Sequence, residues 1–213
     1  MTRQLVQSYA ATDASFVNVG AHYGYYACLA AHCGMNVKAF EPIDANYKML
    51  RDNIAYNDFF DRCRIIHGAV GSEIHITKIY GAFSGATLLP VNTRKPKSMY
   101  QVTQVFTLSE IAIKKEKTLF LIVVEGFELN EISGAAELVA DAENNSWIIE
   151  TSGDNLYALG DKMIDHGYSL FHIGNDKLLQ LHKDDLMECA LNGNFLFTNL
   201  GNESNLNIIK RFS

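Results

Sequence analysis

Long apolar runs are missing from this 213-residue chain. The longest purely aliphatic or aromatic stretch, residues 119–124, is too short to span a bilayer and instead suits a buried strand. The first residues, Met-Thr-Arg-Gln, contain no apolar segment of the kind that a signal peptide requires. We therefore expect a cytoplasmic protein without a membrane span.

Cysteine is also scarce, and its four occurrences form no recognisable metal or redox pattern. Cys28, Cys33, Cys63 and Cys189 make no C-x-x-C pair, and no cluster of cysteine and histidine has the spacing of zinc ligands. Scattered single cysteines fit a reducing compartment, where disulfides are rare. We expect neither a disulfide framework nor a bound metal.

Basic residues are outnumbered, with 18 Lys and Arg against 24 Asp and Glu and a formal net charge of −6. This balance argues against a protein that binds nucleic acid by neutralising many phosphates. Two short basic clusters, 94–97 and 114–117, are more simply interpreted as solvated side chains than as a phosphate site. The composition, with 48% apolar and 20% charged residues, is that of a globular protein, and the length fits one domain over residues 1–213.

Apolar strand-like segments alternate with helical segments along the chain. Strands are expected at residues 15–19, 36–40, 64–67, 74–80, 101–106, 119–124, 147–151, 169–173 and 194–198, and helices at 25–32, 44–57, 107–113, 131–140 and 155–166. This alternation predicts an α/β fold with a parallel sheet covered on both faces. Ligands of such sheets bind beyond the carboxyl ends of the strands, where the strand order reverses.

The turn that follows the first expected strand is the first candidate binding feature. It reads Asn18-Val-Gly20-Ala-His22-Tyr-Gly24 and leads into a helix. Glycine lets a backbone approach a ligand closely, and the start of a helix offers free N–H groups. An ordinary strand–helix turn with a packing glycine has the same sequence pattern, so a second feature is needed to indicate a ligand site.

That second feature is Glu41, which closes the next expected strand 21 residues after Gly20. A carboxylate at this place can accept both hydroxyls of a ribose, so the two features together favour a nucleoside site. The dinucleotide fingerprint G-x-G-x-x-G is not met, because His22 stands where the second glycine would be. A nicotinamide-dependent reductase is therefore the weaker alternative, and a ligand without a pyrophosphate, such as S-adenosylmethionine, fits better.

Two acids, Glu125 and Glu128, follow the most apolar strand. An acid at the carboxyl end of a central strand faces the crevice and could act as general base for a hydroxyl. Glu128 fits equally well as a helix N-terminal acid that complements the helix dipole. His67 is a third candidate base, although it reads more simply as an ordinary histidine at the end of a strand.

Several ordered segments resemble one family, the FkbM-family methyltransferases. Residues 16–26, F-V-N-V-G-A-H-Y-G-Y-Y, resemble that family's F-I-D-V-G-A-N-x-G-Y-Y, residues 39–42 match its A-F-E-P, and residues 124–128 match its V-E-G-x-E. Weaker similarities follow the same order at residues 67–71, 84–90, 105–111 and 147–150. The resemblance runs from about Phe16 to Thr198.

The resemblance implies a Rossmann-like class I methyltransferase fold. Such a fold has a mostly parallel seven-stranded sheet and an antiparallel C-terminal strand. It further implies S-adenosylmethionine as cofactor and O-methyl transfer to a sugar, polyketide or related metabolite, with a small-molecule or glycan acceptor. By position it implies the cofactor-binding residues Asn18, Gly20, His22, Gly24, Glu41, Gly68 and Ala69, and places Glu125 and Glu128 at the transfer site.

The chain departs from the family pattern at four positions. Asn18 replaces the usual Asp and His22 the usual Asn, while Leu121 and Val123 replace the Lys and Asp of I-K-I-D-V-E-G. The alternative is therefore a catalytically impaired relative that binds the cofactor or a protein partner without methyl transfer. The short segment before the first strand also leaves room for a homodimer in which a second subunit completes the site.

Overall fold

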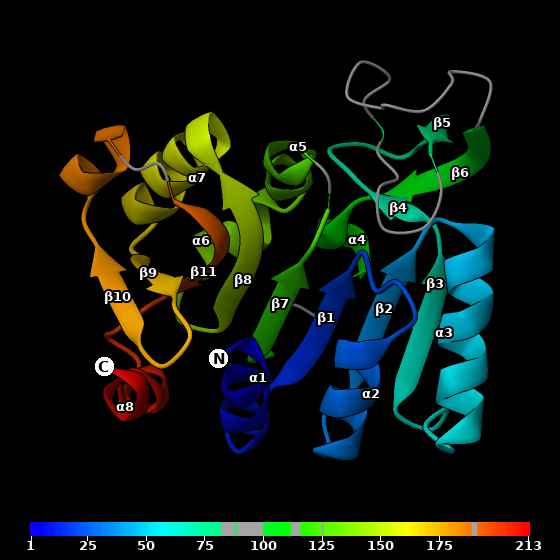
Figure 1. Ribbon diagram of the computed structural model, residues 1–213, viewed down its shortest axis with the longest axis horizontal. Coiled ribbons are helices and arrows are strands. Elements are labelled where there is room, and N and C mark those ends of the chain that lie inside the picture. Colours follow the sequence, from blue (N-terminus) through cyan, green and yellow to red (C-terminus); the bar gives the residue numbers. More distant parts are fainter. Residues whose placement is uncertain (82–87, 89–99, 112–115, 125, 189–190) are drawn as a thin grey trace.

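The computed structural model describes residues 1–81, 88, 100–111, 116–124, 126–188 and 191–213. An eight-stranded sheet forms its centre (Figure 1). Its strands are β1 (Ser15–Val19), β2 (Val37–Glu41), β3 (Cys63–His67), β7 (Thr118–Ile122), β8 (Asn145–Ser152), β9 (Ser169–Ile173), β10 (Leu178–Leu181) and β11 (Asn192–Thr198). Helices cover both faces of this sheet, as the alternating pattern of the sequence predicts.

The strand order is β10-β9-β11-β8-β7-β1-β2-β3. From β1 the chain builds outwards through β2 to β3, and it then returns to place β7 on the other side of β1. The neighbouring strands β3, β2, β1, β7 and β8 are parallel, whereas β11 runs antiparallel to both β8 and β9. The order therefore reverses between β1 and β7, and this is where open parallel sheets form a crevice for ligands.

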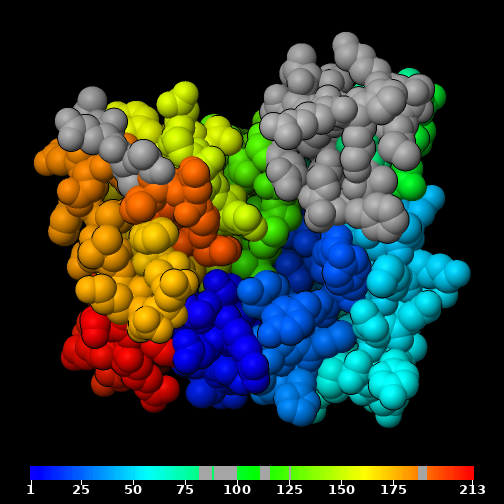
Figure 2. Space-filling model, in the orientation of Figure 1, coloured from blue at the N-terminus to red at the C-terminus, as the bar shows by residue number. Residues whose placement is uncertain are grey.

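The helices fall into two groups, one on each face of the sheet. One face carries α1 (Thr2–Ala10), α2 (Tyr25–His32), α3 (Asp44–Tyr56) and α8 (Glu203–Phe212), which lie across the lower part of the molecule in Figure 2. The other face carries α4 (Leu108–Ile111), α5 (Glu128–Ser133), α6 (Ala136–Ala140), α7 (Gly153–Asp165) and the short 3-10 helix η2 (Lys183–Glu188). In the described helices, no segment is long and apolar enough to cross a membrane.

Alternation along the strands supplies both apolar cores. In β7, Leu119 and Leu121 face the core under α1 and α2, while Phe120 and Ile122 face the core under α5 and α7. All four side chains are fully buried, as expected for a central strand covered on both faces. The ring of Phe120 stacks on that of Trp147 in β8, with centroids 4.0 Å apart.

A separate three-stranded sheet lies beyond the carboxyl ends of β2 and β3, at the upper right of Figure 1. It consists of β4 (Ala69–Val70), β6 (Tyr100–Phe106) and β5 (His75–Tyr80), in that order. Gly68, between β3 and β4, connects it to the main sheet, because its N–H donates to the carbonyl of Glu41 at 3.2 Å. This small sheet thus forms one wall above the carboxyl edge.

The predicted α/β fold and the antiparallel C-terminal strand are confirmed, but the sheet has eight strands, one more than expected. The additional strand, β10, is an edge strand in a polar segment where only Leu178 and Leu181 are buried. Helices α1 and α8 were also not predicted. Each is short and mostly polar, and tertiary packing of a few apolar residues stabilises them more than helix propensity does.

Several element boundaries also differ from the expected ones. The strand expected at 119–124 ends at Ile122, and the helix expected at 131–140 is divided into α5 and α6. A Cβ at Gly134, between these two helices, would overlap the carbonyl oxygen of Gly71, so glycine permits this close packing. The helix expected at 155–166 begins at Gly153, with Ser152 as its N-cap. Most of residues 81–98 lie outside the described part of the chain.

A buried hydrogen bond provides a test of the core under α5 and α7. Trp147 Nε1–H donates to the hydroxyl of Tyr168 at 3.0 Å, and both side chains are buried. Tyr168→Phe leaves the indole N–H without this acceptor and is expected to lower the free energy of unfolding by about 1–3 kcal/mol. Urea unfolding measures the difference. Tyr56→Phe, at a side chain that is 91% exposed, is the matched control and should change the free energy little; equal effects of the two variants would contradict the assignment.

Candidate functional site

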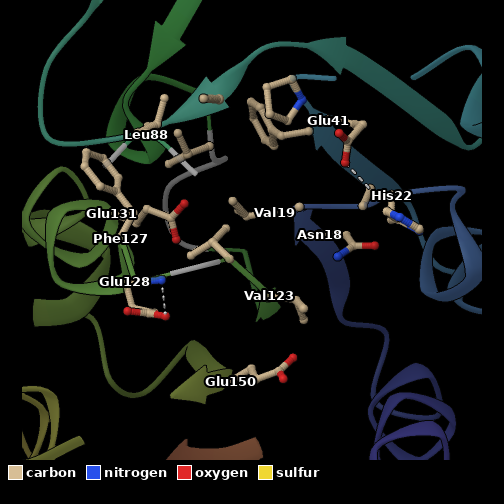
Figure 3. Close-up of a pocket in the computed structure, with 18 of the residues that line it drawn as sticks. Asn18, Val19, His22, Glu41, Leu88, Val123, Phe127, Glu128, Glu131 and Glu150 are labelled. Atoms are coloured by element: carbon tan, nitrogen blue, oxygen red, sulfur yellow. Dashed lines mark hydrogen bonds between the residues drawn. The ribbon is translucent and has the colours of Figure 1, made fainter. Parts of the chain in front are cut away.

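A cavity of about 550 Å³ opens at the carboxyl ends of β1, β2, β7 and β8 (Figure 3). Its walls are the loops that follow these strands, together with the start of β11 and the small sheet. The cavity therefore lies where the strand order reverses, as the topology requires for a ligand site in this type of sheet.

The turn after β1 is shaped by two glycines with positive φ. Gly20 has φ +70°, and a Cβ there would overlap the carbonyl oxygen of Val123 at the end of β7. Gly24 has φ +88°, and a Cβ there would lie 2.5 Å from Leu50 of α3. Gly20 lines the cavity, but Gly24 packs against α3 and is not part of the wall. Close packing within the protein therefore explains why glycine occupies both positions.

His22 lies in the same turn and also has a left-handed backbone, with φ +54°. Its backbone N–H donates to Glu41 Oε2 at 2.7 Å, which holds the turn in this conformation. His22 is part of the cavity wall, and its Nε2 is buried with no hydrogen-bond partner in the described part of the chain. Burial lowers the pKa of His22, so the neutral ring is favoured.

Glu41 lies in the cavity wall and is only 3% exposed. Oε1 accepts from the Ile43 N–H at 2.9 Å and from Asn46 Nδ2 at 3.3 Å, while Oε2 accepts from His22. Burial raises the pKa of Glu41, and these hydrogen bonds oppose that rise. An ionised carboxylate can accept about four hydrogen bonds, so Oε2 can accept another from a ligand.

Three further predicted positions line the cavity together with Glu41. Asn18, in β1, is 2% exposed and lines the cavity, and its Oδ1 has no hydrogen-bond partner among the described residues. Gly68 and Ala69 also line the cavity, and a Cβ at Gly68 would lie 2.5 Å from the ring of Phe106. The structure thus brings together six of the seven predicted cofactor positions, all except Gly24.

The opposite side of the cavity carries acids from α5. Glu128 Oε1 accepts from the Gly126 N–H at 3.1 Å, and Oε2 accepts from Asn155 Nδ2 of α7 at 3.0 Å. Glu131, one turn further along α5, is 2% exposed and also lines the cavity. Burial raises the pKa of Glu131 well above its usual range, and the neighbouring Glu128 raises it further.

Sequence reasoning missed Glu131 as a site residue. The expected helix began at 131, so its side chain had no assigned face, whereas α5 begins at Glu128. With that start, Glu128 and Glu131 are three residues apart and share one face of the helix. Asn155, which bonds Glu128, was likewise not foreseen, because it belongs to a helix that reaches the cavity only through the tertiary fold.

The other two predicted catalytic residues are not part of the described cavity wall. His67 stacks on the ring of Tyr47, with centroids 4.4 Å apart, and its Nε2 lies 3.1 Å from Asp44 Oδ1. These contacts hold it against α3, as expected for a structural histidine, and it does not line the cavity. Glu125 lies outside the described residues.

Two of the departures from the family pattern, in β7 and just after it, have different surroundings. Leu121 is fully buried in the core under α1 and α2, whereas Val123 lines the cavity. A carboxylate at position 123 would therefore have altered the cavity itself, and the leucine at 121 contributes only to packing.

The family model described as a methyltransferase FkbM domain matches residues 18–175. Among solved structures, the FkbM methyltransferase of Methylobacillus flagellatus is similar with a TM-score of 0.60 and 14% identity, over 87% of this chain and 44% of that one. A precorrin-6y C5,15-methyltransferase from Geobacter metallireducens has a TM-score of 0.51 and 11% identity, over 92% of this chain and 84% of that one. No curated protein matches the sequence.

At these identities the solved structures share the fold, and this chain spans less than half the length of the first of them. The family match is more specific, because it covers most of the chain and includes Asn18, Glu41 and Glu128 from the cavity wall. The chain belongs to the FkbM methyltransferase family.

Proposed function

We propose that the protein transfers a methyl group from S-adenosylmethionine to a hydroxyl of a sugar, a polyketide or a related metabolite. The observation that carries this proposal is the buried Glu41 carboxylate, which lies in the cavity wall beside the turn after β1. An acid at the end of the second strand is the usual acceptor for ribose hydroxyls in sheets of this type.

The residues beside Glu41 fit the rest of such a cofactor. The buried Oδ1 of Asn18 lacks a partner in the described structure and suits the ammonium of the methionine part, although it lacks the charge of an aspartate. Gly68 and Ala69 offer backbone and a small apolar surface near the position expected for adenine. When bound, the cofactor supplies a methyl group that is already electrophilic.

The protein then has two tasks, which are to align the acceptor and to take its proton. Alignment of reacting groups can supply roughly 7–11 kcal/mol in favourable cases. Glu128 is the candidate base within the described cavity, since it is fixed by Gly126 and Asn155 on the side opposite Glu41. Glu125 remains a candidate from the sequence.

A second candidate function is cofactor or partner binding without methyl transfer. The observation that favours it is Val123, which lines the cavity where the family usually has an aspartate. Methylated product formed from S-adenosylmethionine and a hydroxylated acceptor would decide against it.

Glu41→Ala tests the cofactor site. Loss of the carboxylate should weaken binding of S-adenosylmethionine and of its demethylated product by about tenfold or more, which corresponds to at least about 1.4 kcal/mol. Calorimetric titration measures both affinities. Glu73→Ala, at an exposed acid of the loop before β5, is the control and should bind like the unchanged protein. Unchanged affinity in Glu41→Ala would remove Glu41 from the site.

The raised pKa of Glu41 predicts a pH dependence of binding. Ribose hydroxyls donate to the ionised carboxylate, so affinity should be constant at neutral pH and fall as the carboxylate becomes protonated. Because burial raises the pKa, this fall should begin above the ordinary value of 4.5. Titrations across pH with the folded protein measure it. The same fall in Glu41→Gln would assign it to another group.

Glu128→Gln and Glu125→Gln test the base. Turnover is measured with an acceptor found by screening hydroxylated metabolites. Whichever of the two variants removes the base should keep its cofactor affinity and lose about 100-fold or more in turnover. Glu143→Gln, at an exposed acid just before β8 at the opposite edge of the sheet, is the control. Full turnover in both variants would show that neither acid takes the proton.

A further inference from the structure

The acceptor side of the cavity contains an acid that the methyl-transfer scheme does not use. Glu131 is 2% exposed, and its Oε2 has no hydrogen-bond partner in the described structure. In Figure 3 its carboxyl points from α5 towards the space between Phe127 and Val19. Oε2 is thus an acceptor in the cavity wall that lacks a donor among the described residues, and a cation beside it would offset the raised pKa of this carboxyl.

A purely structural role explains Glu131 poorly. Leaving a buried polar group without a hydrogen bond destabilises a fold by about 1–3 kcal/mol, and more for a charged group. Its neighbour Glu128 adds repulsion between like charges. An apolar residue would avoid both costs and a glutamine would avoid the repulsion, so the carboxyl is best explained by a donor that arrives with a ligand.

The surroundings indicate the charge of that donor. Among the described residues that line the cavity, four are glutamates and none is lysine or arginine: Glu41, Glu128, Glu131 and Glu150. Among the same described lining residues, His22 is the one titratable ring besides tyrosine, and burial favours its neutral form. An anionic acceptor, such as a phosphorylated or carboxylated sugar, would meet carboxylates with no described cation to balance it.

We propose that Glu131 binds an ammonium group of the acceptor, so that the methyl-accepting hydroxyl belongs to an amino-bearing compound. This inference rests on the proposed function, because it assigns the substrate class of the same cavity. The ammonium donates an N–H to Oε2 of Glu131, and its positive charge also reduces the repulsion between Glu131 and Glu128. Glu128 is a separate side chain on the same face of α5 and keeps its proposed role toward the hydroxyl.

The test uses the smallest probes that carry this chemistry. Ethanolamine, ethylene glycol and glycolate each have a hydroxyl and differ in bearing an ammonium, a second hydroxyl or a carboxylate. Each is titrated into the full chain saturated with the demethylated cofactor, and NMR of isotope-labelled glutamate carboxyls reports on the site. The Glu131 signal is assigned by its loss in Glu131→Gln.

Ethanolamine should move the Glu131 signal saturably, with an affinity about tenfold higher than that of ethylene glycol, and glycolate should not move it. In Glu131→Gln, ethanolamine should lose this advantage. Glu143→Gln, which removes an acid at the opposite edge of the sheet, should keep it. Thermal unfolding of Glu131→Gln checks that the variant is folded, and its midpoint should not fall, because it removes a buried carboxyl that resists ionisation.

An unmoved Glu131 signal, or equal responses to ethanolamine and ethylene glycol, would overturn the inference. Binding of the demethylated cofactor is measured in the same samples before the probes are added. If the cofactor product fails to bind, the proposed function itself is wrong. If it binds and the probes show no preference for the ammonium, only the assignment of the acceptor class fails.

Discussion

The carboxylate of Glu41 connects the parts of the molecule that form the site. It accepts hydrogen bonds from the backbone of His22, which follows β1, and from the backbone of Ile43, which follows β2. Without these bonds, the left-handed conformation of His22 would have little to oppose its strain. One buried acid thus fixes two loops at the edge of the sheet and still presents an oxygen to the cavity.

The cavity that results has two chemically different sides. Around Glu41 the groups are mostly uncharged, with the amide of Asn18 and the backbone of Gly68 and Ala69. Around α5 the groups are acidic, and Glu128 and Glu131 lie close enough for each to affect the other. This division suits a cofactor on one side and an acceptor on the other, with transfer at the boundary near Val123.

The sequence was sufficient to predict the parts that depend on local patterns. β1, α2 and β9 have the predicted bounds, because apolar alternation and helix-ending glycines are encoded within each segment. The positions of Asn18, Gly20 and Glu41 followed from the rule that parallel strands end at one edge. The sequence predicted that Gly20 lies in the turn at the ligand site. It could not predict the close approach to Val123, which depends on a strand about a hundred residues away.

What the sequence could not provide comes from contacts between distant segments. His67 was a candidate catalytic base beside the simpler interpretation of an ordinary strand-end histidine, and only the structure, which places its ring on Tyr47, decides between the two. Glu131 was not assigned to any face of its helix, because its burial depends on where α5 begins and on what packs over it. α1 was missed because its few buried residues, among them Tyr9, gain their stability from packing against the rest of the fold.

A crystal structure of the protein with the demethylated cofactor product tests the account most directly. The account predicts that the ribose hydroxyls lie within hydrogen-bond distance of Glu41 Oε2 and that the amino group lies beside Asn18 Oδ1. The cofactor product bound elsewhere, or bound in this cavity with Glu41 contacting only protein groups, would contradict it.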